Sequence, residues 1–169
     1  MNLSKTAAEL ATRLANARVR VVLAESCTAG LASAALAQTP GISEQFCGSF
    51  VTYRNRSKED WLGVSSVDLK KYSAASDRVA EAMAFTALAR TVEATYSASV
   101  TGHLGPNAPA GSDGIIFVGV ARRAGRTMEP VGVWRHKLKE KSRTKRQAEA
   151  AAWALHHLLI ALGPRGRTG

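Results

Sequence analysis

The protein has 169 residues, a mass of 17.9 kDa and a net charge of +10. This length suits one domain with its own hydrophobic core, and the composition, 46% hydrophobic and 21% charged, excludes wholesale disorder. The apolar stretches fall far short of a membrane span, and two cysteines are too few for a disulfide framework or a four-cysteine zinc site. We therefore expect a soluble, cytoplasmic protein without structural zinc.

The positive charge is concentrated near the C-terminus. Residues 1–121 carry eleven basic and ten acidic side chains, a net charge of +1, whereas residues 122–169 carry twelve basic and three acidic ones, a net charge of +9. Such a segment can face a phosphate-bearing ligand, nucleic acid or water, and composition alone does not choose among these.

The first part of the chain predicts a helix, a buried strand and a second helix. The first helix is expected over 4–17 with Ser4 as its N-cap, and the apolar run at 19–24 predicts the strand. A helix rich in alanine and leucine follows over 30–37 and is stopped by Thr39-Pro40-Gly41. The apolar face of the first helix would consist of Ala8, Leu10, Ala11 and Leu14.

The rest of the chain alternates strands and helices. Strands are expected at 46–53 and 96–101, with a short helix over 57–62 closed by Gly63 and a longer one over 77–93 capped by Ser76. The last elements are strands at 114–122 and 128–138, which read as a hairpin, and a helix over 143–162. The inward residues of that helix would be Ala148, Ala152, Leu155, Leu159 and Leu162.

These elements predict a three-layer α/β/α sandwich around a mixed sheet. We expect both parallel and antiparallel strands in the sheet, because the two strands of the hairpin must be antiparallel. We expect one domain over 1–163 and a flexible basic tail over 164–169.

The sequence AESCTAG marks a candidate site at the end of the first strand. An apolar strand runs into a turn of small residues, and a helix starts at once. In open α/β sheets this is where ligands bind, since hydroxyls such as those of Ser26 and Thr28 meet free N–H groups of the helix start. The alternative is that both hydroxyls only cap the helix.

A second candidate segment is VTYRNRSK, in which Tyr53 ends a strand and Lys58 lies five residues further on. A serine hydroxyl is a weak nucleophile near neutral pH and needs a base, which a lysine of lowered pKa or a tyrosinate can supply. The alternative is a surface lysine and a tyrosine at a sheet edge.

The loop TGHLGPNAPAGSDG and the basic run at 135–146 provide weaker signals. Gly102 and Gly105 allow close approach of the backbone to a ligand, while His103 is either an acid–base group or a loop hydrogen-bonding residue. In the run RHKLKEK, a strand would place the basic side chains on one face, as a phosphate clamp, a nucleic-acid patch or a solvated edge strand.

Together these segments resemble the CinA C-terminal domain family, whose recognised activity is nicotinamide-nucleotide amidohydrolase. The family patterns ESCTGG, GFVTYSN-x-x-K, GAVS and VTGIAGP correspond to ESCTAG at 25–30, SFVTYRNRSK at 49–58, SAAS at 73–76 and VTGHLGP at 100–106. The match covers about residues 5–162, and its first two motifs are the more specific ones. It implies a three-layer sandwich with a roughly five-stranded mixed sheet.

The resemblance implies hydrolysis of the carboxamide of nicotinamide mononucleotide to nicotinate mononucleotide and ammonia, with no metal or organic cofactor. Ser26 matches the family's proposed nucleophile, and Tyr53 and Lys58 match its activating partners. Thr28, Gly30 and Asn55 match neighbouring site positions, and the register from Gln147 favours Lys141 and Lys145 as phosphate contacts.

The chain departs from the family pattern at several of these positions. Ala29 replaces a glycine, His103-Leu104 replaces Ile-Ala, and lysines stand where the family has arginines. Because lysine presents a point charge and arginine a fork, the identity of the substrate is less secure than the class of reaction.

Two other functions remain open at this point. One is a related hydrolase with another amide substrate, and the other is a non-enzymatic basic module that binds nucleic acid or a DNA-processing partner. The serine, tyrosine and lysine favour an enzyme, and the basic segment lacks the interleaved aromatic residues that stack on bases, so nucleic acid is the less favoured partner. We further expect a homo-oligomer that associates through its alanine-rich helices, and no membrane partner.

Overall fold

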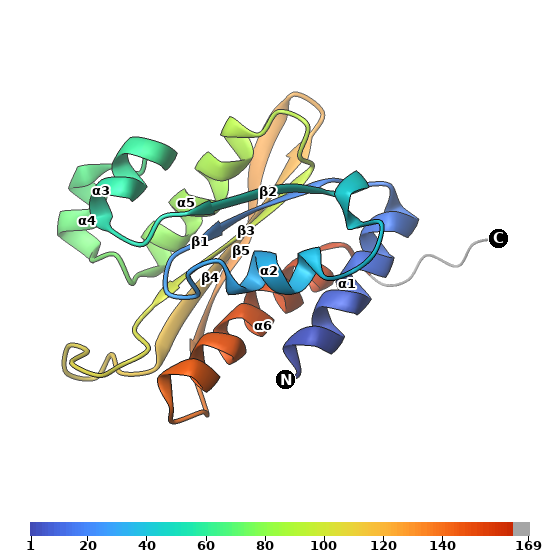
Figure 1. Ribbon diagram of the computed structural model, residues 1–169. Coiled ribbons are helices and arrows are strands. Elements are labelled where there is room, and N and C mark those ends of the chain that lie inside the picture. Colours follow the sequence, from blue (N-terminus) through green and yellow to red (C-terminus); the bar gives the residue numbers. More distant parts are fainter. Residues whose placement is uncertain (164–169) are drawn as a thin grey trace.

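A computed structural model describes residues 1–163, so the expected flexible tail at 164–169 lies outside the described residues. Five strands form one sheet in the order β2-β1-β3-β4-β5 (Figure 1). The central strand β1 (Val21–Glu25) runs parallel to β2 (Phe46–Val51) and to β3 (Tyr96–Gly102). The last two strands, β4 (Ile115–Ala124) and β5 (Thr127–Lys137), form an antiparallel hairpin beside β3. The expected mixed sheet and hairpin are therefore confirmed.

Helices cover both faces of this sheet, which confirms the three-layer α/β/α sandwich (Figure 1). One face carries α1 (Leu3–Ala17), α2 (Leu31–Ala37) and α6 (Arg143–Ala161). The other face carries α3 (Asn55–Ser57), a π-helical turn η2 (Lys58–Leu62), α4 (Ser66–Tyr72) and α5 (Asp77–Arg90). A 3₁₀ turn η1 (Ile42–Glu44) leads into β2. Within residues 1–163, no helix combines the length and the apolar character that crossing a membrane requires.

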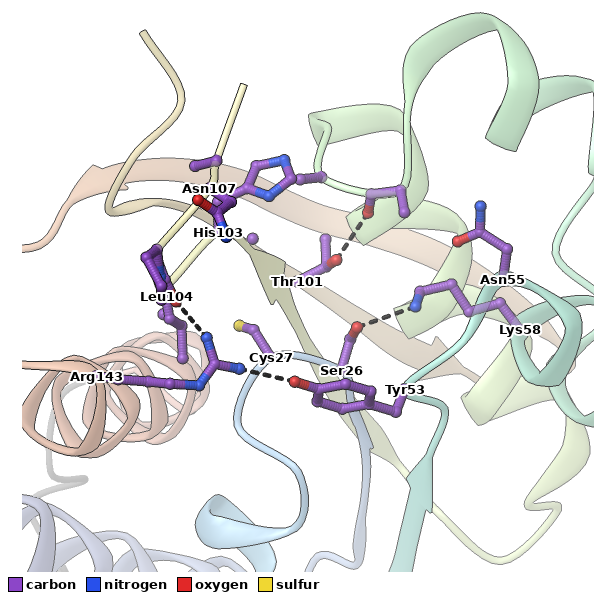
Figure 2. Close-up of a pocket in the computed structure, with 16 residues that line it drawn as sticks. Ser26, Cys27, Tyr53, Asn55, Lys58, Thr101, His103, Leu104, Asn107 and Arg143 are labelled. Atoms are coloured by element: carbon purple, nitrogen blue, oxygen red, sulfur yellow. Dashed lines mark hydrogen bonds between the residues drawn. The ribbon is translucent and has the colours of Figure 1, made fainter. Parts of the chain in front are cut away.

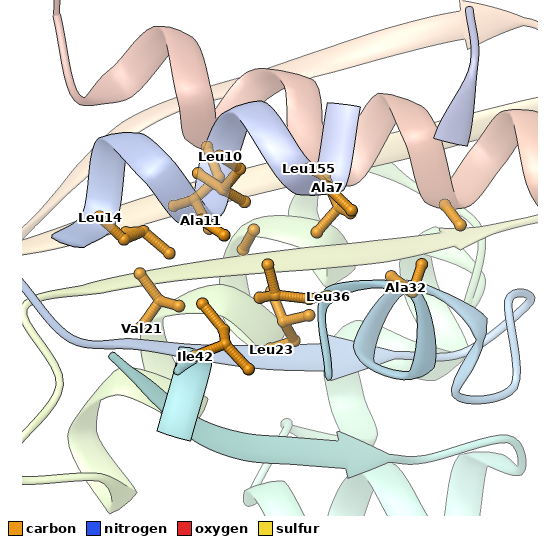
Figure 3. Packing of buried hydrophobic residues seen from close by; sticks show 14 of the residues in the cluster. Ala7, Leu10, Ala11, Leu14, Val21, Leu23, Ala32, Leu36, Ile42 and Leu155 are labelled. Carbon is orange, nitrogen blue, oxygen red and sulfur yellow. The ribbon is translucent and has the colours of Figure 1, made fainter. Parts of the chain in front are cut away.

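The strand β1 reads as a continuous apolar run because it is buried on both faces. Val21 and Leu23 pack with Leu10 of α1 and with residues of α2 and α6 (Figure 3), whereas Val22 packs with α5 on the opposite face. The alternation of side chains along a strand divides one apolar run between two cores. The end of β1 is thereby fixed between two layers.

The backbone of α5 packs directly on β3 and β4 because these strands present small residues to it. The hydroxyls of Ser97 and Ser99 donate to the carbonyls of Ala84 and Ala80 at 2.7 and 2.5 Å. At Gly119 of β4, any Cβ atom would lie 2.6 Å from the carbonyl oxygen of Ala80. These contacts hold α5, and the loop that precedes it, against the sheet end that carries the candidate site.

The two long terminal helices differ in detail from the sequence prediction. Asn2 rather than Ser4 caps α1, because its side-chain oxygen accepts from the amide of Lys5 at 2.9 Å. Ala7, not Ala8, faces the core. In α6 the predicted face was rotated, so Ala148, Leu159 and Leu162 are only half-buried. The buried residues of α6 are Arg146, Ala150, Ala151, Ala152, Ala154, Leu155, His157 and Leu158.

Other elements lie close to their predicted bounds, with two additions. Ser76 and Gly63 cap helices as expected, whereas α4 and η1 had no counterpart in the prediction. The strand expected at 128–138 corresponds to β5, which ends at Lys137, so Lys139 and Lys141 of the basic run lie beyond the strand. Alternation therefore places only Arg135 and Lys137 together on an exposed face.

Candidate active site

The turn after β1 is organised by Glu25, the last residue of that strand. Its side chain is fully buried, and its carboxylate accepts hydrogen bonds from the Thr28 and Ser49 hydroxyls at 2.8 and 3.2 Å. It also accepts from three amides at the start of α2, those of Gly30, Ala32 and Ser33, at 2.9–3.1 Å. The side chain of Glu25 therefore ties the end of β1 to the start of α2 and to β2.

This arrangement corrects one expectation about the helix start. The amides of Gly30, Ala32 and Ser33 were expected to be free for an anionic ligand, but the Glu25 carboxylate occupies them. The Thr28 hydroxyl donates to the same carboxylate. Thr28, Ala29 and Gly30 line neither of the two cavities described below. Their observed role is to shape the turn, which includes Ala29 in a left-handed conformation at φ 52°.

The residue next to Glu25 faces the opposite way and meets a buried amine. Ser26 is itself buried, and Lys58 Nζ lies 2.9 Å from Ser26 Oγ. The same amine donates to the carbonyl oxygen of Thr52 at 2.8 Å. Lys58 is only 1% exposed, because η2 carries it inward beneath the loop that follows β2. Two residues that lie 32 positions apart are thus in direct contact (Figure 2).

The environment of Lys58 shifts its protonation equilibrium towards the neutral amine. Burial lowers the pKa of the Lys58 ammonium to about 8, because water no longer solvates the charge. Within residues 1–163, no carboxylate forms an ion pair with this amine. A lysine in such surroundings can take a proton from a neighbouring hydroxyl near neutral pH.

Cys27 follows Ser26 in the same turn and is a different kind of group. Burial raises the pKa of its thiol to about 12, so the sulfur stays protonated and is a poor nucleophile. Its amide, however, donates to no other residue within residues 1–163. The amide of the residue that follows a nucleophile is a common oxyanion donor in serine hydrolases.

Tyr53 lies on another side of Ser26 and is held by α6. Its side chain is 54% exposed, and its hydroxyl accepts a hydrogen bond from Arg143 Nη2 at 2.7 Å. Arg143 Nη1 also donates to the carbonyl oxygen of Gly105. Figure 2 shows the Tyr53 ring beside Ser26, with Lys58 and Arg143 on different sides. Tyr53 has no hydrogen bond to Ser26 or Lys58 among the described residues.

These side chains open into a cavity of about 230 Å³. Its walls come from the β1 turn, the loop after β2, the loop before α5 and the 101–108 loop. Thr101 Oγ1 ties two of these walls together by donating to the carbonyl of Ala74 at 2.7 Å. No acidic side chain lines the cavity, which gives it a positive character. The lining consists of Ser26, Cys27, Tyr53, Asn55, Lys58, Ala74, Ala75, Thr101, Gly102, His103, Leu104, Gly105, Pro106, Asn107, Ala108 and Arg143.

A second cavity, of about 430 Å³, adjoins the first across the 104–108 loop and Arg143. It adds Lys141, Arg146 and Asp113 to the residues shared with the first. Arg146 is not free there, because its guanidinium binds Asp113 through two bonds of 2.7 and 2.9 Å. Two basic side chains, those of Lys141 and Arg143, remain without an acidic partner among the described residues.

Most of the site residues expected from the sequence converge on these cavities. Ser26, Tyr53, Asn55 and Lys58 line the first cavity together with Gly102 and Gly105, and Lys141 lines the second. Lys145 is exposed and lines neither. Arg143 was expected only as part of the basic run that could form a phosphate clamp, and its contact with Tyr53 was not predicted. No role was predicted for Glu25, although it opens the ESCTAG motif.

Comparison with protein families places the chain in a known group. The model of the CinA C-terminal domain matches residues 3–162. A CinA-like protein of Prochlorococcus marinus strain MIT 9312 is 42% identical over 98 residues, which is 58% of this chain and 23% of the relative. One from Solibacter usitatus is 46% identical over 87 residues, 52% of this chain and 21% of that relative. The chain thus matches about a quarter of the length of these relatives.

Solved structures match over nearly the whole length. The competence/damage inducible protein CihA of Agrobacterium tumefaciens has a TM-score of 0.85 and 31% identity, and the match covers 97% of both chains. A CinA superfamily protein of Escherichia coli has a TM-score of 0.82 and 28% identity over 93% of this chain and 88% of its own. The sandwich described above is the fold of these proteins.

Proposed function

The chain belongs to the CinA C-terminal domain family, and on that premise we propose that it is an amidohydrolase acting on nicotinamide mononucleotide. The observation that carries this proposal is the contact between the buried Lys58 amine and the Ser26 hydroxyl at 2.9 Å. A nucleophile, a base of lowered pKa and an open cavity meet at one point, as amide hydrolysis requires.

Acylation begins with the neutral Lys58 amine. It accepts the hydroxyl proton while Ser26 Oγ attacks the carboxamide carbon, and an Oγ–C bond forms. The carbonyl oxygen becomes an oxyanion, and the amide of Cys27, which donates to no other described residue, is the candidate donor for it. When the C–N bond breaks, the Lys58 ammonium gives the proton to the departing nitrogen, which leaves as ammonia.

Deacylation uses the same groups with water as the nucleophile. Lys58 takes a proton from water as its oxygen attacks the acyl carbon, and then returns a proton to Ser26 Oγ as the Oγ–C bond breaks. The products are nicotinate mononucleotide and the regenerated serine. We expect the hydroxyl of Tyr53, a residue that lines the cavity, to hydrogen-bond the substrate in both steps.

The second cavity supports the assignment of a phosphate-bearing substrate. Lys141 and Arg143 have no carboxylate partner among the described residues, and a phosphate monoester would supply the missing negative charge. Arg143 heads α6, whose first turn contains no acidic side chain, so the partial positive charge of the helix start adds to the attraction. We propose that the carboxamide occupies the first cavity and the phosphate the second.

Ammonia release by the purified protein tests this function. We expect release from nicotinamide mononucleotide and little from nicotinamide riboside, which lacks the phosphate. Ser26→Ala should abolish release while leaving the thermal melting temperature almost unchanged, because Glu25 and not Ser26 caps α2. Substantial hydrolysis by a folded Ser26→Ala protein would exclude the serine mechanism.

The rival functions give different results in the same preparation. A hydrolase with another substrate would release ammonia from a different amide and still depend on Ser26. A nucleic-acid module would release none and would bind duplex DNA with a log–log salt slope steeper than about −4, as many phosphate contacts require.

A further inference from the structure

Arg143 stands between the two cavities and contacts a residue on each side of the site. Its Nη2 donates to the Tyr53 hydroxyl at 2.7 Å, and its Nη1 donates to the carbonyl of Gly105 in the loop that the cavities share. Tyr53 follows β2, and Gly105 follows β3. One side chain of α6 therefore links two loops that approach the nucleophile from different parts of the chain (Figure 2).

The acceptors of Arg143 are both uncharged, although the residue carries a permanent charge. A guanidinium has five N–H donors, and the two bonds to Tyr53 and Gly105 leave the others available. Arg146, one helical turn further on, shows the contrast because it is bound bidentately by Asp113. An exposed arginine with only neutral acceptors is weakly fixed, and an anion in the second cavity would satisfy the rest of its donors.

We propose that Arg143 is a positioning residue through which the phosphate of the substrate fixes Tyr53 and the 102–108 loop beside Ser26. The inference rests on the proposed function, and it adds that the phosphate accelerates the chemical step as well as tightening binding. Binding energy from a remote part of a substrate is often used in this way to orient groups at the reacting centre. Loss of the phosphate should then lower kcat as well as raise KM.

Phosphite dianion, which resembles the missing phosphate group, separates these effects. Added to nicotinamide riboside, it should raise kcat/KM for the riboside by about tenfold, a usual size for coupling between two sites. Arg143→Met should show no such activation. Tyr53→Phe should also lose it, although the second cavity is intact. Arg126→Met, which removes the same charge from the remote β4–β5 turn, serves as the matched control and should be activated like the wild type.

A second measurement does not depend on turnover. In protein labelled with ¹³C-tyrosine, phosphite should shift the Tyr53 signal, which Tyr53→Phe identifies among the three tyrosines. The shift should vanish in Arg143→Met and persist in Arg126→Met. Equal phosphite activation of Tyr53→Phe or Arg143→Met and the wild type, or a Tyr53 signal that phosphite leaves in place, would overturn the proposal.

These outcomes distinguish the inference from the proposed function. Hydrolysis of nicotinamide mononucleotide without phosphite activation of the riboside would refute only the role of Arg143. Failure of the wild type to hydrolyse either compound would refute the proposed function, and the tyrosine signal would still decide whether an anion acts on Tyr53 through Arg143.

Discussion

Two regions of the molecule bury nitrogen bases, one around Lys58 and the other around His136 and His157. Burial lowers the pKa of the bases in both regions, but only Lys58 lines a cavity that a ligand can enter. Beside Ser26, burial lowers the pKa of Lys58 to about 8. Between β5 and α6, burial lowers the pKa of His157 to about 4 and also lowers that of His136. In both regions the exclusion of water shifts the protonation equilibrium towards the neutral base.

The second region is closed by aromatic rings. His136 Nε2 and His157 Nε2 lie 2.7 Å apart, so one ring donates to the other. Trp134 stacks on His157 with centroids 4.1 Å apart, and Trp153 stacks on His136 at 3.7 Å. None of these rings lines the two cavities of the candidate site. The histidine pair thus fastens the last strand to the last helix.

The difference teaches that a lowered pKa does not identify a catalytic base. Perturbed groups occur at functional sites and in structural clusters alike. What separates Lys58 is a nucleophile within hydrogen-bonding distance and a cavity that admits a substrate. Substitutions in the two regions should therefore affect different properties, catalysis in one and stability in the other.

The largest expected effect is on catalysis, at Lys58. Lys58→Arg and Lys58→Met should each lower the rate of amide hydrolysis by about 10²–10⁴-fold, because arginine cannot give up its proton and methionine has none to exchange. Steady-state kinetics with the folded variants measure the loss. A Lys58→Arg enzyme as fast as the wild type would reduce Lys58 to a binding residue and erase the contrast between the regions.

A smaller effect is expected on stability, at the residue beside the nucleophile. Glu25→Gln should lower the free energy of unfolding by about 2–4 kcal/mol. The substitution replaces one carboxylate oxygen, which accepts hydrogen bonds, by an NH₂ group, which cannot accept them from the surrounding hydroxyls and amides. Denaturant titration measures this change. Glu9→Gln, on the exposed face of α1, is the matched control and should change stability by less than about 0.5 kcal/mol. Equal stability of the two variants would show that the Glu25 network does not hold the turn.

The smallest effect is expected at the histidine pair and depends on pH. Because the pKa of His157 is lower in the folded than in the unfolded state, the unfolded chain binds protons first as the pH falls. The stability contribution is therefore present above about pH 6.5 and is lost progressively as the pH falls towards about 4, by about 1–3 kcal/mol.

His157→Phe should flatten this part of the pH–stability profile and leave amide hydrolysis at neutral pH unchanged. Denaturant titrations between pH 4 and pH 7, beside the activity assay, test both statements. A large loss of activity in a stable His157→Phe protein would place the second region in the catalytic machinery and break the comparison.

The sequence predicted the parts of the site that depend on local pattern. An apolar strand followed by small residues and a helix located Ser26, and the short segment after β2 located Lys58. The sequence did not predict partners that are distant along the chain, such as Arg143, which contacts Tyr53 from 90 positions away. Nor did it show that Glu25 occupies the helix start, because the burial of a carboxylate depends on β2 and α2 packing around it.

The errors in the helices have a similar cause. The alanines of α6 lie on several sides of the helix, so the spacing of apolar residues did not define one buried face. Packing against α1 and the sheet determines that Ala150, Ala151 and Ala154 are buried. The helix α4 is seven residues long and buries only Leu69, which is too little for an apolar pattern.

The pH dependence of kcat/KM for the amide that the protein hydrolyses fastest tests the central claim most directly. If the neutral Lys58 amine activates Ser26, activity should rise with pH along a limb centred on about 8, where Lys58 loses its proton. A rate that does not change between pH 7 and 9, or a limb centred near the ordinary lysine value of about 10.4, would contradict the account.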